Sequence, residues 1–140
     1  MVVNGRDAEA AQAAADAIDG AIAHPGSPAD PAVADALIDR CATEFGRIDI
    51  LINCAGTPGL AAESILSVTS ELFRDLLDAH LLTTFETCRA AAPRMVAQGG
   101  GAIVNTTSFA FLGDYGGTGY PAGKGGVNGL TLAVAAELAE

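Results

Sequence analysis

The chain has 140 residues, which is enough for one compact domain and too few for two ordinary ones. Half of its residues are hydrophobic and 17% are charged, a globular composition that excludes a disordered chain. Its net charge of -10 argues against nucleic acid or an anionic membrane surface as a partner, because like charges repel. No apolar run is long enough to span a membrane, and the first residues lack the pattern of a signal peptide.

The three cysteines, Cys41, Cys54 and Cys88, lie far apart and form no CxxC pair. This odd, scattered set predicts buried, reduced thiols in a cytoplasmic protein rather than a disulfide framework or a zinc site. We therefore expect no metal centre.

The first half of the chain alternates short apolar runs with helical stretches. Residues 1–4 predict a strand, residues 7–18 an Ala-rich helix, and residues 21–23 a second short strand. Asp30 at the N-cap and Pro31 at the first helical position predict a helix that ends at Phe45-Gly46.

The second half repeats this alternation with longer elements. The β-branched run at 48–53 predicts a strand buried on both faces, because such runs are typical of parallel sheets covered on both sides. The predicted elements that follow are a helix over 69–96, a strand over 102–107, a Gly-rich loop over 108–119 and a helix over 120–140. Strands that alternate with helices in this way indicate βαβ units and a parallel sheet, whose ligands bind beyond the carboxyl ends of the strands.

Tyr120 and Lys124 are the first candidates for chemistry. They are four residues apart in a predicted helix and so share a face, where a lysine cation favours the phenolate form of tyrosine. A tyrosine of this kind can exchange a proton with an alcohol or a ketone. Taken alone, this common spacing more often marks a surface pair.

Two loops that follow predicted strands add further candidates. Ser108 lies twelve residues before Tyr120, and its hydroxyl could polarise a carbonyl, or it could simply cap a loop. Asn53, Ala55 and Gly56 follow another strand, where small residues let the backbone approach a flat ligand, or form a plain turn.

Taken together, the segments 50–56, 90–95, 101–108 and 120–124 closely resemble the short-chain dehydrogenase/reductase family in order and spacing. The resemblance implies a doubly wound Rossmann fold that transfers hydride between NAD(P) and a small carbonyl or alcohol substrate. It implies that Tyr120 is the general acid/base, that Lys124 lowers the pKa of Tyr120 and holds the nicotinamide ribose, and that Ser108 orients the substrate oxygen. It further implies that the adenosine side of the cofactor is lined by Asn53, Ala55 and Gly56.

The sequence departs from the family at two positions of the site. His80 replaces an Asn that usually supports a proton relay to the active-site Lys; it could take over this catalytic role or be a core histidine with a satisfied hydrogen bond. Ser108 lies one residue nearer to Tyr120 than is usual, and Thr107 occupies the usual spacing. We favour Ser108, because the residue pattern after the strand fits it better.

The family's first strand, its Gly-rich pyrophosphate turn and its C-terminal strands have no counterpart in the sequence. The predicted fold is therefore α/β: an incomplete doubly wound parallel-sheet Rossmann fold that lacks these strands and forms a single partial NAD(P)-binding domain over residues 1–140. We expect a fragment of an oxidoreductase or, alternatively, an inactive interaction subunit that pairs with an intact homologue.

Cofactor choice and assembly rest on less specific features. Arg6 follows the first strand, where an arginine can pair with a 2′-phosphate, so the sequence favours NADP(H) over NAD(H). Apolar residues beyond one stripe on the helix at 73–96 and on the last helix favour a homo-oligomer or pairing with a homologous chain.

Overall fold

A computed structural model describes residues 1–57, 63–113 and 115–139. The chain divides into two compact units. The first unit consists of Met1–Leu51 and Glu86–Ile103, and the second of Ile52–Phe85 and Val104–Glu140. The prediction of a single domain stays a prediction.

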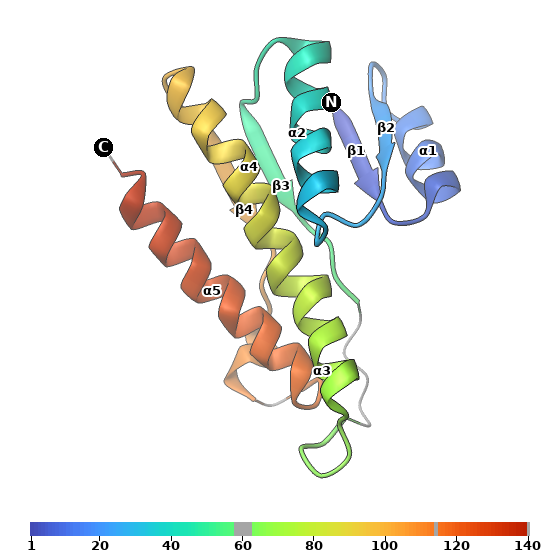
Figure 1. Ribbon diagram of the computed structural model, residues 1–140, viewed down its shortest axis with the longest axis vertical. Coiled ribbons are helices and arrows are strands. Elements are labelled where there is room, and N and C mark those ends of the chain that lie inside the picture. The colour runs from blue at the N-terminus through green and yellow to red at the C-terminus, as the bar shows by residue number, and fades with distance from the viewer. Residues whose placement is uncertain (58–62, 114, 140) are drawn as a thin grey trace. The chain divides into compact units, whose positions relative to one another are not determined.

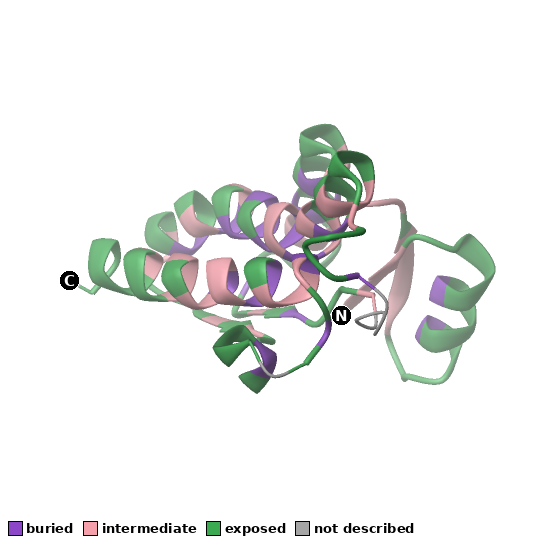
Figure 2. Cartoon of the chain, turned by 90° about the horizontal axis from the view of Figure 1, so that it is seen from below, coloured by how far each residue is buried: buried purple, intermediate pink, exposed green. Residues whose placement is uncertain are grey.

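The first unit begins with a βαβ arrangement, as predicted (Figure 1). Strand β1 (Val2–Gly5) pairs in parallel with β2 (Ile22–Pro25), and helix α1 (Ala8–Asp16) connects them. The buried residues of α1 are Ala11 and Ala15, which are four positions apart and so share one side of the helix; Figure 2 colours the whole chain by burial. Small side chains on that side let α1 lie close to the two strands.

Helix α2 (Pro31–Phe45) confirms the predicted start and stop signals. The Asp30 side chain accepts a 2.9 Å hydrogen bond from the Ala32 N–H, and Gly46 ends the helix with a positive φ of 78°. The buried core of the first unit consists of Ile38, Ile48, Ala91 and Met95.

Strands β3 (Ile50–Asn53) and β4 (Ala102–Asn105) form a second pair. The Asp49 carbonyl accepts from the Ala102 N–H and the Asn53 carbonyl from the Thr106 N–H, both at 2.8 Å, so the two strands run in the same direction. The prediction that residues 48–53 are buried on both faces is wrong: Ile50 is 63% and Ile52 61% exposed. Among the described residues nothing covers the face that carries these two side chains.

The predicted long helix is present, but it contains a wider turn. Helix α3 (Ser70–Leu77) begins at Thr69, whose hydroxyl accepts from the Leu72 N–H. It continues through a π-helical turn, η1 (Asp78–Leu82), into helix α4 (Thr83–Ala97). Residue periodicity cannot predict such a turn, because one extra residue barely disturbs a 3.6-residue pattern.

The last part of the chain contains a short 3₁₀ turn, η2 (Phe109–Leu112), within the predicted loop, and then helix α5 (Gly119–Glu137). The described residues thus form an α/β fold with parallel strand pairs, as the sequence predicted. Among all the described residues, no helix combines the length and the apolar character that crossing a membrane requires.

Candidate functional site

The second unit brings Tyr120 and Lys124 together at the start of α5. The Lys124 ammonium lies 6.0 Å from the centroid of the Tyr120 ring. Lys124 is only 5% exposed, and its Nζ donates a 2.8 Å hydrogen bond to the Thr106 carbonyl at the end of β4. Burial lowers the pKa of Lys124, and the interaction with Cys54 partly opposes this shift. The ammonium is thus held beside the phenol ring by the protein backbone.

The loop before α5 packs tightly around Tyr120. Gly116 has a φ of 89°, and an added methyl group there would lie 2.7 Å from Tyr120 Cδ1. The half-exposed Tyr115 ring stands edge-on to Tyr120, with 6.4 Å between ring centroids. Tyr120 itself stays partly exposed.

His80, in the π-helical turn, lies against the same tyrosine. The two ring centroids are 4.9 Å apart and the ring planes are perpendicular. His80 is 1% exposed, and its Nε2 lies 3.5 Å from the Thr57 hydroxyl. Its Nδ1 has no hydrogen-bond partner among the described residues. Burial lowers the pKa of His80, the positive charge of Lys124 lowers it further, and Thr57 opposes both effects.

Two hydroxyls after β4 are used differently. Ser108 Oγ accepts a 3.2 Å hydrogen bond from the Ala110 N–H and caps η2, as one of the two interpretations predicted. Thr107 Oγ1 instead donates its hydrogen to the Lys124 carbonyl at 3.1 Å. A hydroxyl has one hydrogen, so Ser108 still has a hydrogen to donate, whereas that of Thr107 is used within the protein.

The predicted cofactor residues after β3 fall into two groups. Asn53 is buried and donates through Nδ2 to Asn105 Oδ1 at 2.9 Å, and Asn105 donates in turn to the Thr131 hydroxyl at 3.0 Å. This chain of bonds ties β3 and β4 to α5 and uses the Asn53 amide within the protein. Ala55 and Gly56, by contrast, are exposed beyond the end of β3.

Two further outcomes concern Arg6 and Cys54. Arg6 is exposed at the end of β1 in the first unit, whereas the other predicted site residues belong to the second. The prediction that the cysteines are buried is wrong for Cys54, which is exposed and accepts a 3.4 Å contact from the Thr106 hydroxyl.

The sequence analysis did not single out Glu63. It is 4% exposed, and neither carboxylate oxygen has a hydrogen-bond partner among the described residues. Its carbonyl accepts a 2.8 Å bond from the Thr118 N–H, directly before α5. No sequence signal marks it, since an isolated acidic residue is normally exposed.

The family model for short chain dehydrogenases matches residues 1–140. The chain belongs to the short-chain dehydrogenase family. It is 41% identical over 110 residues to a 3alpha-hydroxysteroid dehydrogenase of Mediterraneibacter gnavus, covering 78% of this chain and 43% of the relative. It is 36% identical to a cyclohexanol dehydrogenase of an Acinetobacter species, covering 100% of this chain and 57% of the relative.

A solved structure shows the same likeness. A crystal structure of a short-chain dehydrogenase from Streptomyces avermitilis matches with a TM-score of 0.88 and 28% identity, covering 99% of this chain and 51% of that one. This short-chain dehydrogenase chain therefore spans about half the length of the relatives it matches.

Proposed function

We propose that this protein is an NAD(P)-dependent oxidoreductase that interconverts a carbonyl and an alcohol, with Tyr120 as its general acid/base. The observation that carries the proposal is the fixed pair on α5. A buried ammonium, fastened to the Thr106 carbonyl, lies 6.0 Å from the Tyr120 ring centroid. A cation in that place attracts the negative charge of a phenolate, the form that accepts the proton of an alcohol.

The residues around the pair suit a nicotinamide cofactor. Hydrogen bonding to Thr106 uses one of the three Lys124 ammonium hydrogens, which leaves two for the hydroxyls of a ribose. Ala55 and Gly56 expose backbone with almost no side chain, so a flat ring can approach it closely. When bound, the cofactor supplies the hydride.

In the reductive direction, Tyr120 donates its phenolic proton to the carbonyl oxygen of the substrate; in the oxidative direction, its phenolate accepts the proton of the alcohol. Ser108 donates its remaining hydroxyl hydrogen to the same substrate oxygen and holds it near the phenol. Lys124 keeps the phenolate stabilised. The exposed side chains Phe109, Phe111 and Leu112, which follow Ser108, favour a substrate with an apolar body.

The test is turnover of cyclohexanone with NADPH and with NADH by the native protein. Tyr120→Phe should lower kcat/KM by about 10²- to 10⁴-fold, the usual contribution of general acid–base catalysis. Tyr115→Phe is the matched control, because it removes a neighbouring phenol that has no assigned role. Ser108→Ala should lower kcat/KM more than Thr107→Val. Equal activity of the Tyr120→Phe and wild-type proteins would refute the proposal.

We further propose that NADP(H) is preferred over NAD(H), with Arg6 pairing with the 2′-phosphate. Arg6→Ala should weaken NADPH binding about tenfold and leave NADH binding unchanged, since a charge-assisted contact to phosphate contributes about 1.5 kcal/mol. Arg40→Ala, an exposed arginine of the same unit, serves as the control. Calorimetric titration measures both affinities, and equal losses for the two cofactors would contradict the preference.

A second candidate function is a catalytically inactive subunit that pairs with an intact homologue. The exposed apolar face of β3 and β4, with Ile50, Ile52 and Val104, favours it, because such a face gains free energy when another chain covers it. Co-purification of a longer dehydrogenase, together with absence of turnover, would support this candidate. A homo-oligomer and a cytoplasmic location remain part of the first proposal.

A further inference from the structure

The π-helical turn fixes where His80 lies. The Thr84 hydroxyl donates a 2.7 Å hydrogen bond to the His80 carbonyl, and the Thr83 hydroxyl donates a 2.8 Å bond to the Asp78 carbonyl. The Asp78 carbonyl also accepts from the Thr83 backbone N–H, the bond that closes the wider turn. The His80 ring that this turn carries is one of the largest fully buried side chains of the described chain.

Two glycines lie flush against this ring. A methyl group added at Gly56 would lie 2.6 Å from His80 Nδ1, and one added at Gly123 would lie 3.0 Å from His80 Cβ. With these two backbones against it and the edge-to-face contact with Tyr120, the imidazole has little freedom to rotate or shift.

The hydrogen bonds of the ring indicate which nitrogen carries the proton. Nδ1 has no partner among the described residues, whereas Nε2 lies within reach of the Thr57 hydroxyl. A buried N–H without an acceptor is costly, so the neutral ring with hydrogen on Nε2 fits best. The titratable groups that reach the ring come from α5: Tyr120 by ring contact and Lys124 by its positive charge, which disfavours an imidazolium.

A proton relay requires a ring that gains and loses protons through both nitrogens. Here Nδ1 lies against the Gly56 backbone and has no hydrogen-bond partner in the described part of the chain, and the protonated ring would be repelled by the Lys124 cation. Each of these observations opposes proton transfer through His80, whereas each is compatible with a rigid aromatic wall.

We propose that His80 is a positioning residue whose neutral imidazole holds the Tyr120 ring in its reactive orientation and takes no proton during turnover. This inference rests on the proposed function of Tyr120. Without the ring, Tyr120 gains rotational freedom, and a misplacement of about 1 Å in a reacting group can cost about 100-fold in rate. We expect the loss in kcat rather than in KM, because the buried His80 ring contacts Tyr120 and acts through it.

The first test needs no turnover. In the native protein labelled with ¹⁵N-histidine, the His80 signals, assigned by their loss in His80→Asn, should show hydrogen on Nε2 alone at neutral pH, and should keep this pattern as the pH drops below the usual histidine pKa of about 6.5. His24, the other histidine, is the internal control. A His80 ring that carries hydrogen on both nitrogens at neutral pH would overturn the inference, whatever the activity of the protein.

The second test uses kinetics. His80→Leu, which removes the aromatic ring and offers no group that could relay a proton, should lower kcat about 10- to 100-fold with KM changed by less than about twofold. His80→Phe, which keeps an aromatic ring without a titratable nitrogen, should retain more activity. A folded His80→Phe protein as inactive as Tyr120→Phe would show that a ring nitrogen is needed and would overturn the inference. Failure of Tyr120→Phe to lose activity would instead refute the proposed function and leave the NMR result standing.

Discussion

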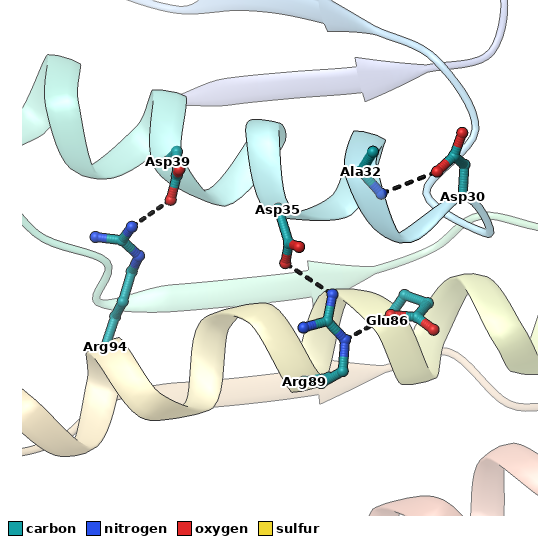
Figure 3. Close-up of polar contacts among 7 residues, drawn as sticks. All are labelled: Asp30, Ala32, Asp35, Asp39, Glu86, Arg89 and Arg94. Carbon is teal, nitrogen blue, oxygen red and sulfur yellow. Dashed lines mark hydrogen bonds and ion pairs between the residues drawn. The ribbon is translucent and has the colours of Figure 1, made fainter.

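The two units of the molecule treat charged and polar side chains in opposite ways. In the described chain all five ion pairs lie in the first unit, and most of their side chains face solvent, as do those of Arg94 and Asp39 between α4 and α2 (Figure 3). The second unit instead buries His80, Lys124 and Glu63 without an ion pair among the described residues.

This difference shows which polar groups serve the surface and which serve the site. Exposed pairs keep most of their hydration and contribute little to stability. Burying a polar group costs free energy, and a group that forms few hydrogen bonds recovers only part of that cost. The Lys124 ammonium, which donates to the Thr106 carbonyl, is an example. The second unit accepts this cost at the side chains around Tyr120, where the chemistry is proposed.

The tight packing around His80 offers the largest expected effect on stability. Gly56→Ala should lower the free energy of unfolding by about 1–3 kcal/mol, because the added methyl would lie 2.6 Å from the His80 ring. Gly129→Ala, in a part of α5 with open space around it, should instead raise it by about 0.5–1 kcal/mol. Urea denaturation measures both, and equal effects would mean that the ring is loosely packed.

The titration of His80 should have an effect of intermediate size on the free energy of unfolding. Its pKa is lower in the folded protein than the usual value of about 6.5, so below that pH the unfolded chain binds a proton that the folded protein does not. Stability should therefore be full above about pH 6.5 and fall as the pH drops toward the folded pKa. In His80→Asn this slope should be smaller. Unfolding curves between about pH 5 and pH 7 measure the slopes.

The surface pairs of the first unit should give the smallest effect. A double-mutant cycle on Arg94 and Asp39, using alanine at each position, should yield a coupling of about 0.2–1 kcal/mol. The coupling should shrink in about 1 M salt, because the Debye length there is about 3 Å. A larger coupling that persists in salt would mean that this pair is protected from water, and the contrast between the units would weaken.

Much of the fold followed from local sequence signals. Asp30-Pro31 and Gly46 set the bounds of α2, and the β-branched runs gave β3 and β4. The exposure of Ile50 was not predictable, since a β-branched run looks the same whether or not another element covers its second face. The π turn at His80 leaves no trace in the hydrophobic pattern.

The sequence predicted which residues form the candidate site, but it did not predict all the hydrogen bonds that they make. The four-residue spacing of Tyr120 and Lys124 placed them on one face of α5, as the structure has them. The Thr107 hydroxyl donates its hydrogen to the Lys124 carbonyl, whereas the Ser108 hydroxyl accepts a bond and retains its hydrogen. This difference depends on the path of the loop, which short-range patterns do not determine. The roles of these residues in catalysis stay predictions.

Helix α5 has a consequence for how the protein matures. Its first half contains Gly119, Gly123 and Gly126, which lie against Leu76, His80 and Leu81, and each glycine costs about 1 kcal/mol of helix propensity. Such a segment is a poor helix by itself and becomes regular only when α3 and η1 supply the contacts. On a nascent or partly unfolded chain, Tyr120 and Lys124 are therefore two unrelated side chains. The two side chains meet only where α5 is packed against α3 and η1, so a change that loosens this packing separates them without touching either residue.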